Sequence, residues 1–240
     1  MRQINGASLW DAPFICYDSS VMIPKVFLLP IFVFAIPAIS LAYNPIINET
    51  TVPYEVTTIS EIGSQTEYLG DLVGDPQMYE FAVGETTNLK MALIQADSDT
   101  LIPFSLIVVK QNEDKGGVSE VGRLNGSKVE WQKVEDSVLG MNFSKSEVFT
   151  AVLKPGIYKA EVSTPENYGK YALVVGDQTE KVGYFATLSD IYTFQTFFGG
   201  SIFSMFKSSY VYYPLGILLI ISVFYFTWRQ RNKIKGISHA

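Results

Sequence analysis

The stretch AVLKPGIYKAEVSTPENYGKYALVVG, residues 151–176, carries the clearest indication of how the chain folds. Within it Tyr158, Ala160 and Val162 fall on one face of an extended segment, and the charged residues between them fall on the other. Successive side chains of a β-strand point to opposite faces, so this alternation predicts a strand with one buried face. The pair Pro155-Gly156 in front of it is typical of a turn.

The same pattern extends towards the N-terminus. Short apolar-alternating runs recur about every 8–12 residues with Gly, Pro, Asn or Asp between them, which is typical of an all-β sandwich or barrel. We therefore predict an antiparallel β-sandwich or jelly roll over residues 43–186. The expected strands are Glu67–Val73, Met78–Val83, Asn88–Gln95, Phe104–Lys110, Val118–Leu124, Lys128–Lys133, Ser137–Asn142, Val148–Leu153, Ile157–Ser163, Tyr171–Val175 and Val182–Ala186.

The last of these strands resemble the closing strands of pre-peptidase C-terminal-type domains. Such domains show an apolar strand, a Pro-Gly turn, a Tyr and then Gly-x-Tyr-x-Leu; the matching residues here are Pro155, Gly156, Tyr158, Gly169, Tyr171 and Leu173. The stretch 74–81 also resembles their early Tyr-x-Phe strand. The resemblance implies a jelly-roll-like sandwich of the kind that serves as an accessory module on secreted proteins, some of which bind calcium or polysaccharide. No peptidase precedes the domain here, so no protease-linked role is implied, and the layout resembles that of small prokaryotic membrane proteins.

A second feature is the uncharged run YVYYPLGILLIISVFYFTW, residues 210–228. A helix needs about 20 residues to cross the hydrocarbon core of a bilayer, and residues 209–228 meet that length. Pro214 is expected in or near the first turn, where a missing N–H is tolerated. Four of the first seven residues of the tail 229–240 are basic, which predicts a cytoplasmic C-terminus: Arg229, Arg231, Lys233 and Lys235. The alternative is a core helix of a soluble protein.

The N-terminal 42 residues are predicted to be a targeting segment. Lys25 precedes the apolar run of residues 26–42, and Ser40 and Ala42 stand at positions −3 and −1 of a cleavage site before Tyr43. Met22 is a second candidate start. The alternative is an uncleaved signal anchor, which would make a second span.

Residues 187–208 lie between the predicted sandwich and the predicted span. Thr187 and Asp190 offer helix-capping groups, and apolar residues at helical spacing follow, from Ile191 to Phe206. Gly199-Gly200 should weaken or break the helix in the middle. Three placements stay open: an amphipathic helix in the membrane interface, a helix packed on the base of the sandwich, or a docking surface for another membrane subunit.

Composition argues against several chemistries. The one cysteine, Cys16, lies in the targeting segment, and the one histidine, His239, lies in the tail. Thiolate, zinc-histidine and Ser-His-Asp chemistry are therefore not expected of residues 43–208, and we predict no enzyme activity and no cofactor. The same residues contain 22 acids and 12 bases, a net charge of −10, which disfavours nucleic acid as a partner.

A few residues are candidates for modification or ion binding. The sequons at Asn48, Asn125 and Asn142 predict N-glycosylation if the host provides it. Asp97 and Asp99 are calcium candidates, but two acids supply few of the 6–8 oxygens that calcium takes, so a solvated turn is favoured.

Three functions fit these features. The first is a non-enzymatic, single-pass cell-membrane protein whose sandwich is a binding module or an accessory subunit of a membrane complex. The second is a carbohydrate-binding or carboxylate-dependent carbohydrate-active domain, which would need two acids about 5–9 Å apart in a groove. The third is a cargo-receptor-like protein, which should also carry a coiled coil and a disulfide.

Overall fold

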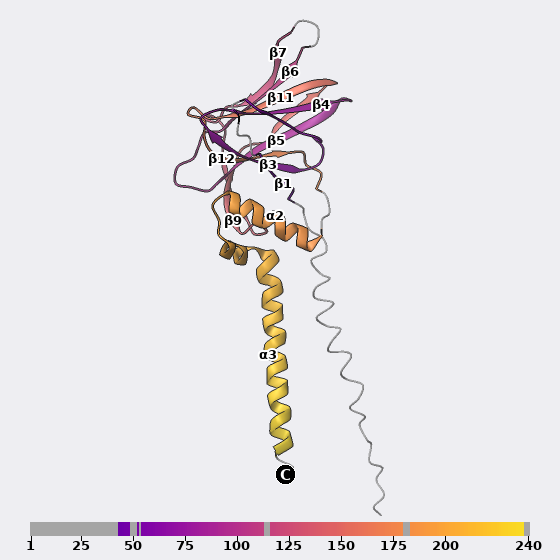
Figure 1. Ribbon diagram of the computed structural model, residues 1–240, viewed down its shortest axis with the longest axis vertical. Helices are drawn as coiled ribbons and strands as arrows, with labels where there is room; N and C mark the ends of the chain where they lie inside the picture. The colour runs from indigo at the N-terminus through magenta and orange to yellow at the C-terminus, as the bar shows by residue number, and fades with distance from the viewer. Residues whose placement is uncertain (1–42, 49–51, 53, 113–115, 180–182, 238–240) are drawn as a thin grey trace, which may run out of the picture. The chain divides into compact units, whose positions relative to one another are not determined.

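The computed structural model describes residues 43–48, 52, 54–112, 116–179 and 183–237, with side chains up to Arg231 (Figure 1). All of them belong to one compact unit of the chain, Ile36–Ala240. The predicted targeting segment and its cleavage site therefore lie outside the described residues.

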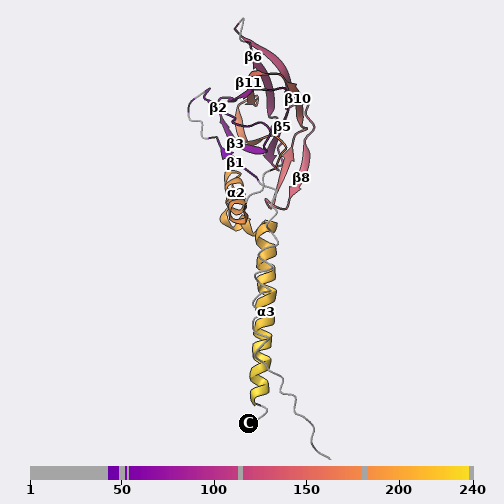
Figure 2. The same ribbon diagram turned by 90° about the vertical axis from the view of Figure 1, so that its right-hand side faces the viewer.

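The described chain is mostly β, with two sheets that face each other across a shared core (Figure 1). The first sheet has the order β1-β3-β12-β5-β9-β8, and β10 also pairs with β5, beside which it lies in Figure 2. Its strands are β1 (Pro45–Ile47), β3 (Thr66–Val73), β5 (Thr87–Ala96), β8 (Gln132–Asp136), β9 (Met141–Lys145), β10 (Phe149–Leu153) and β12 (Tyr168–Val175).

The second sheet has the order β2-β4-β11-β6-β7. Its strands are β2 (Val56–Thr58), β4 (Gln77–Val83), β6 (Ser105–Gln111), β7 (Val118–Leu124) and β11 (Gly156–Ser163). The alternation predicted for β11 is confirmed, because Tyr158, Ala160 and Val162 are buried and the residues between them are not. The predicted β-sandwich is therefore present.

Three helices follow the sandwich: α2 (Tyr184–Phe197), a 3-10 helix (Ile202–Lys207) and α3 (Ser209–Ile237). The predicted break at Gly199-Gly200 is confirmed, since Gly199 has φ +85° and lies between the first two helices.

The core between the sheets is rich in tyrosine. Tyr79 and Tyr171 are fully buried, and their hydroxyls lie 2.8 Å apart; Tyr171 donates in turn to Gln77 Oε1 at 2.7 Å. Gly70 leaves space for these hydrogen-bonded side chains, because a Cβ there would come within 2.5 Å of the Tyr171 ring. Buried hydroxyls are stable only when hydrogen-bonded, and each of these has a partner.

Several predicted elements were wrong in detail. The expected strand Val182–Ala186 is not a strand where it is described, because Tyr184 to Ala186 form the first turn of α2. The predicted strand Ser137–Asn142 begins at Met141 instead, since residues 137–140 form the turn between β8 and β9. Asp136 Oδ1 stabilises that turn by accepting the N–H groups of Val138 and Leu139, both at 2.9 Å.

Two strands were not predicted at all. β1 and β2 have three residues each and pair in parallel with β3 and β4, so each sheet is mixed rather than purely antiparallel. Three residues are too few for an alternation signal, and their position is set by the neighbouring strand.

Candidate functional site

The junction between the sandwich and α3 is held by a hydrophobic cluster of its own and by several hydrogen bonds. A second hydrophobic cluster lies on the outer face of the first sheet, separate from the core between the sheets. It joins Ile191 and Phe194 of α2 to side chains of the sandwich, which are Leu69, Leu139, Phe143 and Ala172. The Phe143 ring lies 5.5 Å from that of Phe194 and 5.8 Å from that of Phe198, both at steep angles. Edge-to-face pairs of this kind add to the free energy gained by burial.

This cluster places the first part of residues 187–208. Ile191 and Phe194 are buried against the sandwich, whereas Ile202 and Phe206 later in the same stretch are exposed. The predicted capping by Thr187 and Asp190 was wrong, because α2 starts at Tyr184 and both residues lie inside it. Thr187 is buried together with Ile191 and Phe194, so it lies in the packed part of α2 and not at its start.

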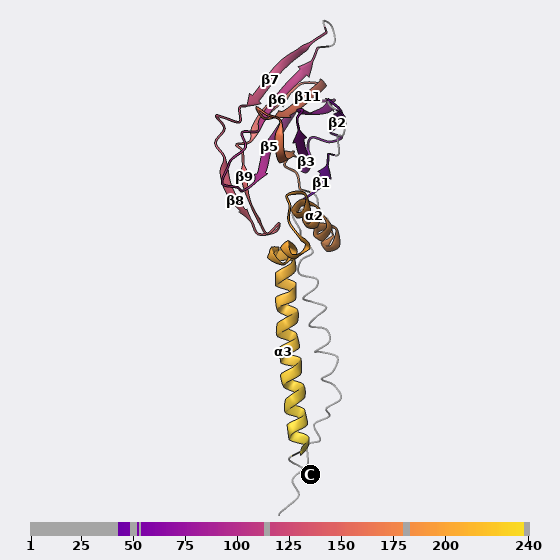
Figure 3. The ribbon, with the colours of Figure 1, turned by 60° about the vertical axis from the view of Figure 1, so that its left-hand side comes forward.

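Hydrogen bonds reinforce the junction at the turn between β8 and β9. Gln195, which is 1 % exposed, donates from Nε2 to the carbonyl oxygens of Leu139 at 2.5 Å and Ser204 at 3.2 Å. Ser208 Oγ donates to Val138 O at 2.5 Å, and Ser209 N donates to Ser137 O at 2.8 Å. The turn thus contacts α2, the 3-10 helix and the start of α3, and Figure 3 shows the two strands that carry it side by side.

A proline inside α3 creates a further link to α2. Pro214 has no N–H, so the carbonyl of Tyr210, four residues earlier, lacks its intrahelical donor. Tyr184 Oη donates to that carbonyl at 2.8 Å, and the two tyrosine rings stack with centroids 5.8 Å apart. Pro214 is the sixth residue of α3, near the first turn as the sequence predicted, and the side chain of Tyr184 compensates for the lost bond.

Ionisable groups line a small cavity of about 130 Å³ beneath α2. Glu67 is 1 % exposed, and burial raises the pKa of its carboxyl, with a smaller contribution from Asp190. Tyr43 donates a hydrogen bond to Asp136, and its pKa is also raised, first by burial and then by the charge of Asp136. Lys145 is the cation among the lining residues. Ligand pockets are usually about 300–1,000 Å³, so this cavity is small for one.

None of these ionisable residues was predicted as a site. Glu67 shares a strand face with Leu69, and both are buried by α2 and the segment before β1. Period-2 alternation could have placed Glu67 on the same face as Leu69, but only knowledge that α2 covers that face would have marked the glutamate as buried.

The predicted membrane span coincides with α3. The stretch Ser209–Arg231 is long and apolar enough to cross a membrane, and none of its most apolar window is buried. Arg229 and Arg231 are exposed near its end; Lys233 and Lys235 lie in the same helix, but their side chains are outside the described part. Apolar side chains also remain exposed at the start of α2, at Phe185, and in the 3-10 helix before the span, at Ile202, Phe203 and Phe206.

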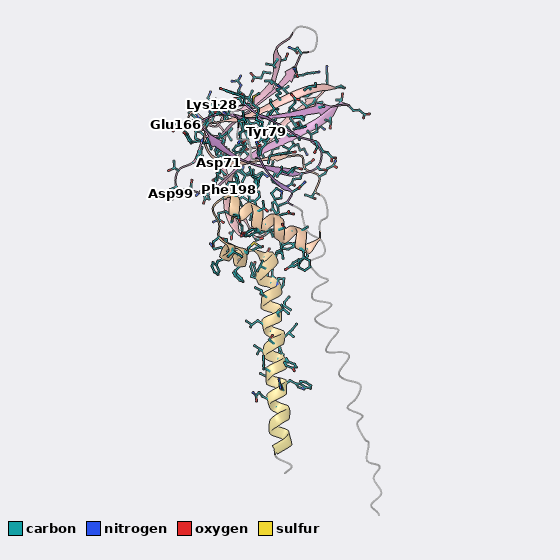
Figure 4. All side chains as sticks on the ribbon, in the orientation of Figure 1. Asp71, Tyr79, Asp99, Lys128, Glu166 and Phe198 are labelled. Atoms are coloured by element: carbon teal, nitrogen blue, oxygen red, sulfur yellow. The ribbon has the colours of Figure 1, made fainter. Side chains whose placement is uncertain are left out.

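The calcium candidates do not come together with other acids. Asp97 lies 3.0 Å from Lys133 Nζ, and Asp99 is exposed in the following turn (Figure 4). Within the described ranges there is no group of three or more His, Cys, Asp or Glu side chains placed to hold a metal ion.

The three sequon asparagines lie in different environments. Asn125 and Asn142 are exposed, in a turn and in β9. Asn48 is half-buried; its Nδ2 donates to Tyr79 Oη at 3.4 Å, and its Oδ1 accepts from Thr57 Oγ1 at 2.8 Å. A glycan on Asn48 would take one of the two N–H groups of Nδ2 beside Tyr79, whereas the side chains of Asn125 and Asn142 are exposed.

Comparison with known proteins adds a similarity of fold only. No protein-family model matches the chain. No curated protein matches it either. Among solved structures it is similar to the pre-peptidase C-terminal domain of a collagenase from Bacillus anthracis, with 17 % identity over 52 % of this chain and 98 % of that one and a TM-score of 0.33. It is also similar to PliG, a periplasmic inhibitor of g-type lysozyme from Aeromonas hydrophila, with 14 % identity over 51 % and 96 % and a TM-score of 0.28. At these values neither similarity assigns a family or a function.

Proposed function

We propose that the chain is a non-enzymatic, single-pass cell-membrane protein whose sandwich lies outside the cytoplasm and acts as a binding module or accessory subunit. The observation that supports this most is the packed junction. A module on a flexible linker needs no contacts with its anchor, whereas here a buried cluster and several hydrogen bonds join α2 and the start of α3 to the first sheet. Such contacts favour a fixed orientation, which an accessory subunit requires.

The exposed apolar side chains before α3 are the proposed contact with the bilayer. Phe185 is 83 % exposed and Phe203 is 75 % exposed, and Ile202 and Phe206 accompany them. Phe203 and Phe206 lie within six residues of the span, where aromatic side chains favour the lipid–water interface. The exposure of several large apolar groups together is costly unless lipid or protein covers them.

The proposal that the chain is not an enzyme rests on residue chemistry. The sole histidine is at position 239, in the predicted tail. The two most buried carboxylates near the cavity accept hydrogen bonds from the protein itself, Glu67 from Asn44 N and Asp136 from Tyr43. Carboxylates that already accept hydrogen bonds from the protein give no particular support to the carbohydrate-active alternative.

Affinity purification tests the proposal. The full-length protein, tagged at its C-terminus, is isolated from gently solubilised native membranes and its companions are identified by mass spectrometry. A stoichiometric companion that is lost when residues on the sandwich surface are changed supports the binding module. Recovery of the protein alone, combined with turnover of a substrate by the pure protein, would contradict it.

A photo-crosslinking amino acid at position 203 then tests the bilayer contact, with position 152 as the control because Val152 is an exposed apolar residue of the sandwich. Lipid adducts at 203 and not at 152 are expected. A single protein adduct at 203 would instead show that a second membrane subunit covers this surface.

A further inference from the structure

The buried carboxylate of Glu67 forms no ion pair with a cation among the described residues. Its Oε2 accepts the N–H of Asn44 at 2.8 Å, and its Oε1 accepts Gln65 Nε2 at 2.7 Å. Neither donor carries a charge, and the charged side chain that acts on its pKa, Asp190, is another acid. A buried carboxylate is normally paired with a cation, so this position is electrostatically incomplete.

The chain segment beside Glu67 is the one that follows the predicted cleavage site. Glu67 contacts the backbone of Asn44 twice, because Glu67 N also donates to Asn44 O at 3.1 Å. Consecutive backbone nitrogens are at most about 3.7 Å apart, so the nitrogen of Tyr43 lies within about 6.5 Å of Glu67 Oε2. Rotation about one bond of a free terminus could close much of that distance.

Tyr43 itself is firmly placed by its side chain. Its hydroxyl donates to Asp136, and its ring packs against Phe194 with centroids 6.1 Å apart. A chain that began at Tyr43 would therefore be held by its first residue, with the new terminus directed to the same region as Glu67 and Asp190. Lys145 also lines this region, but no ion pair between it and Glu67 is present in the described part of the chain.

We infer that cleavage between Ala42 and Tyr43 creates an α-ammonium group that forms an ion pair with the buried carboxylate of Glu67. Hydrolysis of that peptide bond adds one water: the Ala42 carbonyl becomes a carboxylate, and the Tyr43 nitrogen becomes an ammonium group. The charge that Glu67 lacks is thus supplied by processing, and the junction beneath α2 is completed only in the processed chain. This inference rests on the proposed export of the sandwich.

The test uses the full chain, tagged at its C-terminus, expressed in exporting cells and purified in detergent. N-terminal sequencing should return Tyr43 as the first residue. The pKa of its α-amine, measured by competitive acetylation at a series of pH values, should lie about 1 pH unit above the ordinary value of about 7.7–8.0, because a nearby negative charge favours the ammonium form. In Glu67→Gln it should return to the ordinary range.

Asp71→Asn is the matched control, since Asp71 lies in the same strand and is exposed; it should leave the pKa of the α-amine raised. A different N-terminus, or an ordinary pKa in the unmutated protein, would overturn the inference even if Glu67→Gln failed to fold. Accessibility of the C-terminal tag in sealed cells separates this failure from that of the proposed function: a protected tag with a wrong N-terminus overturns the ion pair alone.

Discussion

Tyr184 Oη lies 2.8 Å from the carbonyl oxygen of Tyr210, the carbonyl that Pro214 leaves without a donor inside α3. The hydroxyl of Tyr184 in α2 thus supplies the donor that α3 lacks near its start, next to the sandwich. This relationship makes the junction a structural unit, and several consequences can be measured on the full chain in detergent.

The first prediction concerns this hydrogen bond. Tyr184→Phe should lower the free energy of unfolding by about 1 kcal/mol, because it leaves the Tyr210 carbonyl without a donor. In a Pro214→Ala background the same change should cost less, since the N–H at 214 can then bond to that carbonyl. Denaturant unfolding of the four variants gives the coupling free energy. Equal costs in both backgrounds would contradict the link, and Tyr192→Phe, at an exposed position of α2, is the control.

The hydrophobic cluster around Phe194 should contribute more to the free energy of unfolding than the Tyr184 hydrogen bond does. Phe194 is 1 % exposed and contacts three other rings, so Phe194→Ala should lower stability by about 3–5 kcal/mol, the usual cost for a buried phenylalanine. Phe185→Ala removes an equal side chain from a largely exposed position of the same helix and should change the free energy of unfolding by less than about 0.5 kcal/mol. Similar losses for both variants would show that α2 is not packed as described.

Gly140 tests the contact between the turn and the start of α3. It has φ +63°, and a Cβ there would come within 2.6 Å of the Lys207 backbone, so Gly140→Ala should both strain the turn and displace residues 207–208. Gly74 also has a positive φ, +95°, but a Cβ there would meet open space. Gly74→Ala should therefore cost only about 1–2 kcal/mol from strain, and Gly140→Ala should cost clearly more in thermal unfolding. An equal cost would remove the evidence for close packing.

The buried tyrosines predict a loss of stability in alkali. Burial raises the pKa of Tyr79 to about 12, whereas an unfolded tyrosine titrates near 10. The unfolded state therefore binds fewer protons than the native state above pH 10, and stability should fall as pH rises from about 10 to about 12. Tyr79→Phe should flatten this part of the pH profile of the free energy of unfolding. An unchanged profile in the variant would assign the loss to other groups.

Much of the sandwich could be predicted from the sequence because its strands alternate clearly. β11 shows the period of two along its whole length, and the turn residues Pro155-Gly156 precede it directly. The strand limits that were predicted wrongly are those that depend on contacts with residues distant in the sequence. The turn after β8 is formed by the Asp136 side chain and by contact with residues 207–209, and neither contact leaves a periodic signal.

The junction could be predicted only in part. The apolar spacing at Ile191 and Phe194 indicated a helix with one buried face, but it did not identify the surface that covers this face. The burial of Glu67 could not be predicted for the same reason. Its strand has the sequence pattern of a half-exposed strand but is buried on both faces where α2 covers it. Burial imposed by a helix more than a hundred residues later in the chain has no local signature.

Protease protection in sealed cells tests the central claim most directly. The full chain carries a C-terminal tag, and protease is added outside intact cells and, in parallel, after permeabilisation. If the sandwich is outside and the tail inside, external protease should degrade the sandwich and leave a tagged fragment of α3 and the tail, which disappears on permeabilisation. Loss of the tag in intact cells, or protection of the sandwich under conditions that digest a known surface protein, would contradict a membrane-anchored module outside the cytoplasm.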